Sequence, residues 1–356
     1  MLNAPCTTDI ALVKNTSEAL SFVAYGLDWQ VGDNIVSSNE EFPSNRIVWQ
    51  SLADQQVEFR EANLSTAETP EDALFALVDK HTRLISISSI QFASGLRMNL
   101  QRIGEFCKQQ HILFCIDAIQ SIGAVQFDVQ KYQADFVMAD GHKWMLGPEG
   151  LGVFYSSPAA REQLKLTQYG WHMMHDTHNY ENKPWDTHPA AQRFECGSPN
   201  TLGIHALSAS LSVLLDTGMA TVERQVLANA RYLMDAIQSH PRLELLSNAS
   251  AHLQSGIVVF RHTQMTQQAL YTHLQENNVV CAMRGGGIRF SAHFFYNVAQ
   301  ARHATSRNSG TPVAVIRSPT QRIGDAPAAL RPPQTEHKAA QSWLPQMALR
   351  LFGIKF

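Results

Sequence analysis

The sequence has few charged residues, and those of opposite sign nearly cancel. Only 17% of the 356 residues are Asp, Glu, Lys or Arg, against about 25% in an average soluble protein. The 28 Lys and Arg and the 31 Asp and Glu leave a net charge of −3, whereas a nucleic-acid-binding protein has a clustered basic excess. No apolar run approaches the roughly 18 residues that span a bilayer. The composition therefore argues against both a nucleic-acid partner and a membrane span.

Cysteine is scarce as well. The five cysteines lie far apart, form no C-x-x-C pair and are odd in number: Cys6, Cys107, Cys115, Cys196 and Cys281. That pattern indicates reduced thiols rather than a disulfide framework. The first residues have neither the basic end nor the apolar stretch of a signal peptide. From these absences we expect a cytoplasmic protein.

What the chain does have is length and apolar residues. Hydrophobic residues make up 44% of the sequence, enough for a buried core, and the length suggests about two domains. Charge is unevenly spread, because residues 301–356 carry a net charge of +6 and residues 1–300 one of −9. Residues 301–356 are also rich in proline and lack a sustained period. This composition predicts a basic, disordered tail.

Apolar runs and amphipathic stretches alternate over the first part of the chain. Strands are predicted at 34–38, 84–88, 112–116, 136–139 and 151–155, and helices at 16–26, 44–55, 70–80 and 99–110. The alternation predicts a large α/β domain over 1–200, with a mostly parallel sheet and helices on both faces. After a loop-rich stretch, helices at 203–217, 220–239 and 266–277 and strands at 254–261, 278–283 and 287–292 predict a smaller α+β domain over 201–300.

Two strand ends carry residues suited to catalysis. One predicted strand runs into Asp117, and another leads to Lys143, which stands between His142 and Trp144. Ligands of α/β sheets bind at the carboxyl ends of the strands. Apolar surroundings would lower the pKa of Lys143 and free its amine as a nucleophile. A single Asp is more often a cap of the next loop, but together the pair fits a pyridoxal-phosphate site, in which a lysine forms a Schiff base and an acid partners the ring nitrogen.

A phosphate cradle is also present in the pattern. Asn15 and Glu18 have the spacing of an N-cap and its partner at the start of the first helix. The free N–H groups of that helix and the hydroxyls of Thr16 and Ser17 could hold a phosphate. A capping box without a ligand has the same signature, so both interpretations stay open.

Together these motifs resemble a known family. Lys143 in D-G-H-K-W-x-L-G-P-E-G, Asp117 in I-D-A-x-Q-S and the segment 193–200 (R-F-E-C-G-S-P-N) are similar to class V aminotransferases. These are fold-type-I pyridoxal-phosphate enzymes that include cysteine desulfurases, and the resemblance covers about residues 10–297. It implies that Lys143 binds the cofactor as an aldimine and that Asp117 partners its ring nitrogen. It also implies that Gln120 bonds the phenolic oxygen, that Thr16 and His142 contact the phosphate, and that Ser198 reaches the phosphate of a partner subunit in a homodimer.

Two further residues follow from the resemblance. Phe42, in Glu41-Phe-Pro-Ser-Asn45, matches the position of a residue stacked on the cofactor ring, where desulfurases have histidine; a core phenylalanine is the alternative. Arg289, in a glycine-rich segment, matches the arginine that binds the substrate α-carboxylate through two parallel hydrogen bonds. A surface salt bridge is the alternative for Arg289.

The sequence also departs from the family. The loop that carries the reactive cysteine of desulfurases is shortened to residues 283–287, and Cys281 is expected to be a buried, inert thiol. Persulfide chemistry is therefore disfavoured. Asp140 stands where some members have a phosphate-binding serine, so it is not assigned a role in binding the phosphate.

A second cluster suggests a metal. The residues His172, His175, Asp176, His178 and His188 lie close together in sequence, but the loop-like composition does not support fixed ligand geometry. We expect no metal and interpret the segment as a loop over the site entrance. Nucleotide-binding and serine-hydrolase motifs are absent from the sequence.

The first hypothesis is a pyridoxal-phosphate-dependent aminotransferase acting on a small amino acid, with Lys143, Asp117 and Arg289 as catalytic residues. A lyase, desulfurase or epimerase of the same family is the alternative. A truncated, inactive relative is the rival from another class, because the family has a longer segment before the helix at 16–26 and a final helix where this chain has its basic tail. On that basis the N-terminal segment of the large domain is expected to be missing.

Overall fold

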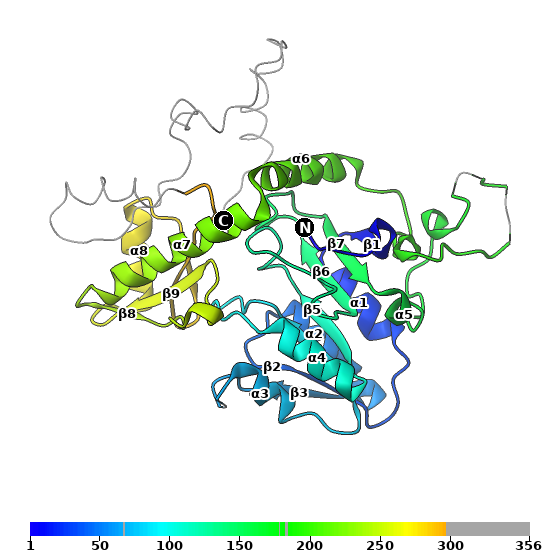
Figure 1. Cartoon of the computed structure of the whole chain (residues 1–356), viewed down its shortest axis with the longest axis horizontal. Helices are drawn as coiled ribbons and strands as arrows, with labels where there is room; N and C mark the ends of the chain where they lie inside the picture. Colours follow the sequence, from blue (N-terminus) through cyan, green and yellow to red (C-terminus); the bar gives the residue numbers. More distant parts are fainter. Residues whose placement is uncertain (67, 178, 182–183, 297–356) are drawn as a thin grey trace, which may run out of the picture.

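The computed structural model describes residues 1–66, 68–177, 179–181 and 184–296 (Figure 1). The predicted tail at 301–356 and His178 lie outside the described residues. The first sheet has seven strands in the order β1-β7-β6-β5-β4-β2-β3. Their bounds are β1 Ile10–Val13, β2 Asn34–Ser38, β3 Glu58–Ala62, β4 Thr82–Ser88, β5 Leu113–Asp117, β6 Phe136–Asp140 and β7 Gly152–Ser156.

Most neighbouring strands of this sheet are parallel. β3, β2, β4, β5 and β6 run in one direction, while β7 is antiparallel to β6 and β1 is antiparallel to β7. The reversal occurs where β6 and β7 are joined by the short, glycine-rich turn at 141–151, because a parallel return needs a crossover of a dozen residues or more. That turn carries Lys143.

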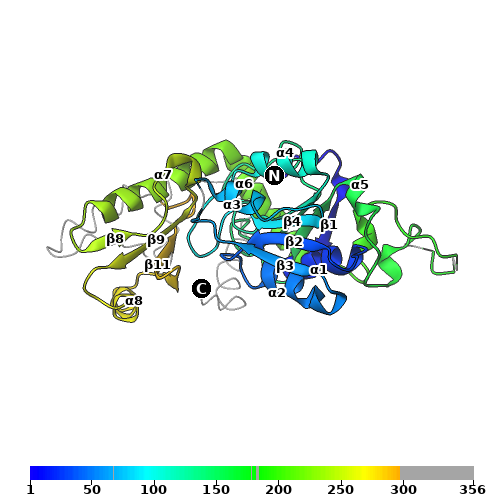
Figure 2. The ribbon, with the colours of Figure 1, turned by 90° about the horizontal axis from the view of Figure 1, so that it is seen from below.

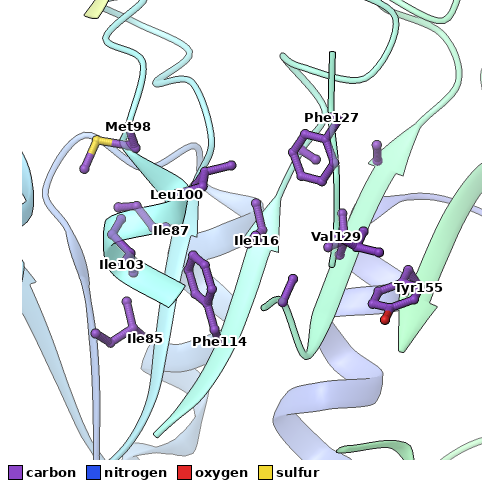
Figure 3. Close-up of a cluster of buried hydrophobic side chains, with 14 of the residues drawn as sticks. Ile85, Ile87, Met98, Leu100, Ile103, Phe114, Ile116, Phe127, Val129 and Tyr155 are labelled. Atoms are coloured by element: carbon purple, nitrogen blue, oxygen red, sulfur yellow. The ribbon is translucent and has the colours of Figure 1, made fainter. Parts of the chain in front are cut away.

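Helices cover both faces of the sheet. Their bounds are α1 Thr16–Gly26, α2 Ser44–Gln50, α3 Pro70–Phe75, α4 Leu100–Gln110 and the short α5 Pro158–Arg161. On one face, Ile103 of α4 packs with Ile87 and Phe114 of the strands (Figure 3). On the other face, Leu20 of α1 and the fully buried Trp49 of α2 belong to a second apolar cluster. The central strands are thus buried on both sides, as their continuous apolar runs predict.

A four-stranded antiparallel sheet in the order β10-β11-β9-β8 forms a second core. Its elements are β8 Leu243–Leu245, β9 Ile257–His262, α8 Gln267–Glu276, β10 Ala282–Arg284 and β11 Gly287–Ser291. Helices α6 Thr201–Thr217 and α7 Met219–Gln238 lead into it and meet at 84°. Figures 1 and 2 show this sheet to one side of the first, with α7 packed along it.

No described helix is by itself long and apolar enough to cross a membrane; α6 and α7 reach that threshold of length and composition only as a bent pair.

The predicted elements agree with the structure except at sheet edges and short segments. β1, β3 and β8 were not predicted; β3 is a half-exposed edge strand with charged residues, which weaken the apolar signal. The helix predicted at 70–80 ends at Phe75, and that at 44–55 continues after Gln50 only as 3-10 turns. The strand predicted at 278–283 is reduced to Ala282–Arg284.

Candidate active site

The carboxyl ends of three neighbouring strands bring the candidate residues together. β4, β5 and β6 are parallel and adjacent, so the residues that follow Ser88, Asp117 and Asp140 meet at one edge of the sheet. Lys143 lies three residues beyond the end of β6. The strand-end arrangement predicted from the sequence is therefore present.

Asp117 is a buried carboxyl at the centre of this edge. Its side chain accepts a hydrogen bond from the backbone N–H of Ile119 at 3.0 Å, and the residue is 2% exposed. Burial raises the pKa of Asp117 to about 7; the charge of Glu41 adds to the rise, and Lys143 opposes it. A cation placed against Asp117 would stabilise its carboxylate and lower this pKa.

Lys143 is a cationic residue whose charge acts on Asp117. Burial lowers the pKa of its amine, the positive charge of Arg289 lowers it further, and Asp117 acts in the opposite direction. The Nζ atom lies 5.4 Å from the centre of the Phe42 ring. A lysine in this setting has a larger neutral fraction than a surface lysine, which is what a nucleophile or general base requires.

Arg289 reaches the same place from the second sheet. Its Nη1 donates to the backbone oxygen of Phe92 at 2.6 Å, and its buried Nε has no hydrogen-bond partner in the described part of the chain. Phe92 and Phe42 form a T-shaped pair with ring centres 5.1 Å apart. The guanidinium thus stands beside the aromatic wall of the site with unused donors, as expected of a group that binds a carboxylate.

Gln120 and Trp144 form a fixed pair next to Lys143. Trp144 Nε1 donates to Gln120 Oε1 at 2.9 Å, and this bond orients the Gln120 amide so that its NH₂ group is left for another acceptor. His142 Nδ1 lies 3.7 Å from Asp140 Oδ2 and has no hydrogen-bond partner among the described residues. Both side chains can therefore still contact a ligand.

The start of α1 differs from a simple phosphate cradle. Asn15 caps the helix by accepting from the Glu18 N–H at 2.8 Å, as predicted. The Thr16 N–H, however, donates to Asp140 Oδ1 at 2.9 Å, and Thr16 Oγ1 accepts from the Asp140 N–H at 3.1 Å. The Ser17 hydroxyl donates to Ser44 Oγ at 2.9 Å.

A carboxylate already stands at this helix terminus, and a phosphate bound here would lie beside Asp140. Burial raises the pKa of Asp140, which favours its neutral form, and His142 opposes that rise. The lysine, acid and arginine positions fit pyridoxal phosphate, since within the described ranges the Asp117 carboxyl bonds only to the Ile119 N–H and Arg289 Nε has no acceptor. On the phosphate side, Thr16 and the unpartnered His142 are the contacts that remain.

Three further features concern residues that the sequence singled out. Ser198 lies exposed in the loop before α6, and no hydrogen bond of the described residues joins it to the site. Cys281 is half-buried rather than buried, because it immediately precedes the short edge strand β10; burial raises the pKa of its thiol. The hairpin between β10 and β11 turns on Gly285 and Gly286, which have φ of +59° and +76°. A two-residue turn has no room for a cysteine-bearing loop.

The histidine-rich segment makes separate polar contacts. His172 Nδ1 lies 3.2 Å from the backbone oxygen of Glu195, and His175 Nδ1 lies 3.3 Å from Asp186. Across residues 1–66, 68–177, 179–181 and 184–296, no group of three or more His, Cys, Asp or Glu side chains could hold a metal ion.

Sequence reasoning missed Glu41. This residue is 5% exposed, and its carboxylate bonds to Ser88 and Gln91 at the end of β4. The signal in the sequence is its place directly before Phe42, the residue that lies over Lys143.

Comparisons with known proteins confirm the family that the motifs resemble. The family model for aminotransferase class V matches residues 1–309. A probable cysteine desulfurase of Methanothermobacter thermautotrophicus is 29% identical over 314 residues, which are 82% of this chain and 76% of that protein. One of Pyrococcus abyssi is 32% identical over 226 residues, 61% of this chain and 54% of that protein. The chain therefore spans between about half and three quarters of these relatives.

The fold has close counterparts among solved structures. A complex between the cystine C-S lyase C-DES and its reaction product, cysteine persulfide, has a TM-score of 0.77 at 21% identity and covers 84% of this chain and 81% of C-DES. A mutant of C-DES was solved with glycine covalently linked to its PLP cofactor. The predicted fold class, a mostly parallel sheet with helices on both faces, is confirmed.

Proposed function

The chain belongs to the aminotransferase class V family, and from this premise we propose that it is a pyridoxal-phosphate-dependent enzyme acting on a small α-amino acid. The observation that carries the proposal is the meeting of Lys143, Asp117 and Arg289: Asp117 and Arg289 both act electrostatically on the buried Lys143 amine, and Arg289 donates to the Phe92 carbonyl beside the Phe42 ring. When bound, the cofactor supplies an electron sink for the charge left at Cα.

The residues of this edge divide the work of holding the cofactor. Asp117 would partner the ring nitrogen, and Gln120, fixed by Trp144, would offer its NH₂ group to the phenolic oxygen. Phe42 would cover one face of the ring, since it already stands over the lysine amine. Thr16 and His142 would contact the phosphate.

Two residues would act on the substrate. The Arg289 guanidinium would bind the α-carboxylate, since its remaining donors are free for two parallel hydrogen bonds. The Lys143 amine, whose pKa is lowered by burial, would remove the α-proton at Nζ and return it at the end of the cycle.

For the reaction itself we favour β-elimination from a sulfur-containing amino acid. The relatives reported above are named cysteine desulfurases, and the two-residue turn at Gly285 and Gly286 carries no thiol that could receive the sulfur. Lys143 would take the α-proton while the C–S bond breaks and its electron pair leaves on sulfur. With cysteine and water the products would be pyruvate, ammonia and hydrogen sulfide. Transamination, the first hypothesis from the sequence, is the second candidate because the matched family bears that name.

A homodimer is also proposed. Helix α6 is rich in apolar residues and exposes Leu202 and Val213, which are spaced so that they lie on the same side of the helix. A surface of this kind is typical of an interface. In a dimer Ser198, just before α6, could reach the partner's cofactor. Sedimentation equilibrium tests this, and a monomer at micromolar concentration would contradict it.

The decisive experiment for the enzyme is cofactor binding. The purified chain mixed with pyridoxal phosphate should develop the absorbance band of the cofactor joined to a lysine, and borohydride reduction with peptide mapping should locate it on Lys143. Lys143→Ala should lose the band, whereas the matched control Lys131→Ala, at an exposed lysine, should keep it. A wild-type chain without the band would instead support the inactive relative.

The reaction is then identified by its products. An amino-acid panel is scored for sulfide, ammonia, keto acid and D-isomer. Sulfide with equimolar pyruvate from cysteine supports elimination. Keto acid that forms only with an amino acceptor supports transamination, and a D-isomer supports epimerisation.

A further inference from the structure

Glu41 lies in the turn between β2 and α2 and is surrounded by hydrogen-bond donors. Oε1 accepts from the Ser88 N–H at 2.8 Å, from Gln91 Nε2 at 2.8 Å and from Ser38 Oγ at 3.3 Å. Oε2 accepts from Asn45 Nδ2 at 2.8 Å and from Ser88 Oγ at 2.5 Å. The five donors come from β2, α2 and the end of β4, so this carboxyl ties together three segments of the sheet edge.

The contacts favour the anionic form of Glu41. All five contacts are donated to its oxygens; to accommodate a protonated carboxyl, a serine hydroxyl or the Gln91 amide, whose Oε1 has no partner among the described residues, would have to turn and accept. Burial raises the pKa of Glu41, and the donations from Ser88, Gln91 and Asn45 oppose that rise. None of the salt bridges among the described residues involves Glu41. Burying an unpaired charge is costly, so the five hydrogen bonds must hold this carboxyl in place without the help of an ion pair.

The residues that follow Glu41 and Gln91 in the sequence form the aromatic wall of the site. Phe42 follows Glu41, and Phe92 follows Gln91. The two rings pack at 5.1 Å, with Phe42 over the Lys143 amine. The backbone oxygen of Phe92 accepts the 2.6 Å hydrogen bond from Arg289.

We propose that Glu41 is a positioning residue that links the cofactor face of the site to its carboxylate-binding arginine. By fixing the turn at 41–42 against the turn at 91–92, the buried carboxylate holds Phe42 over Lys143 and sets the carbonyl that orients Arg289. This inference rests on the proposed function for the identity of the ligands. The arrangement itself belongs to the chain without any ligand.

Glu41→Gln tests the link, because glutamine keeps the shape of the side chain but turns an NH₂ group toward a shell of donors. In the apoprotein, the rate of acylation of Lys143, followed by peptide mass spectrometry, should rise about tenfold. The weakened hydrogen bonds to residue 41 would no longer hold Phe42 over the Lys143 amine. In the loaded enzyme, KM for the amino-acid substrate should rise more than kcat falls, because Arg289 loses its orientation. Glu41→Asp should restore part of both values.

Glu71→Gln is the matched control. Glu71 is also a buried glutamate, 3% exposed, and its carboxylate accepts a backbone hydrogen bond from Asn99 at 2.7 Å. Its variant should lower the melting temperature without changing Lys143 acylation or KM. The proposal is overturned if Glu41→Gln behaves in the same way.

If Glu41→Gln does not fold, Gln91→Met removes one donor and keeps the volume. It should raise Lys143 acylation by a smaller factor, and an unchanged rate would overturn the proposal. This test is independent of the proposed function, because the acylation of Lys143 can be measured even in a wild-type chain that binds no pyridoxal phosphate.

Discussion

Replacing Asp117 by asparagine should stabilise the protein without cofactor at alkaline pH. The carboxyl is 2% exposed and has one backbone donor, from Ile119, so its charged form is poorly solvated. Asparagine has nearly the same shape, can keep the Ile119 bond through its oxygen, and carries no charge at any pH. Comparing the wild type with Asp117→Asn therefore isolates the free-energy cost of ionising this buried carboxyl.

The magnitude follows from the pKa of Asp117, which burial raises from 3.8 to about 7. Because the folded protein binds this proton more tightly than the unfolded chain does, the free energy of unfolding falls as pH rises from about 4 to about 7. A shift of this size costs about 4 kcal/mol in the wild type above pH 7. In Asp117→Asn the loss is absent, so the difference between the variants should change by about 4 kcal/mol between pH 4 and pH 8, in favour of the variant.

Urea unfolding of both apoproteins, followed by far-ultraviolet circular dichroism at several pH values, measures the difference. Asp79→Asn provides a control of opposite sign, because Arg60 and Asn34 lower the pKa of Asp79; that variant should be the less stable one at pH 7 and approach the wild type in acid. Pyridoxal phosphate should stabilise the wild type more than Asp117→Asn. If the free energies of unfolding of Asp117→Asn and the wild type differ by the same amount at pH 4 and at pH 8, the reasoning is refuted.

Three other substitutions test the site and the core. Arg289→Lys keeps the charge but not the paired donors, so KM for the amino acid should rise on the order of tenfold with a smaller change in kcat; unchanged steady-state kinetics would remove Arg289 from substrate binding. Gly104→Ala would place a Cβ 1.9 Å from the backbone oxygen of Tyr132, so α4 must shift and the urea midpoint should report a loss of roughly 1–3 kcal/mol. Arg161→Met would leave the buried Asp9 carboxylate without its partner at 3.1 Å, costing about 3–5 kcal/mol; if Asp9→Leu in the same chain does not recover stability, the ion pair is not the cause.

Local sequence was sufficient for the parts of the fold whose signal is local. The central strands are continuous apolar runs, and the cap at Asn15 marks the start of α1. These patterns predicted the α/β class and placed Asp117 and Lys143 at the carboxyl ends of two strands, which the structure shows to be neighbours. β3 was missed because a strand at a sheet edge need not be apolar on both faces. β1, Ile10–Val13, is apolar but has only four residues, too few to show a period.

The sequence also supplied the chemical identity of the candidate site, through a lysine and an acid at strand ends and a motif order typical of the family. It did not determine what those side chains touch. Thr16 meets Asp140 across 124 residues, Arg289 meets Phe92 across 197, and Glu41 meets Gln91 across 50. Residue patterns show the periodicity within one segment. The pKa of Asp117 and the orientation of Arg289 depend instead on which distant segments pack together. Only the tertiary structure brings those segments into contact, so it alone decided that a buried carboxylate joins the two halves of the site.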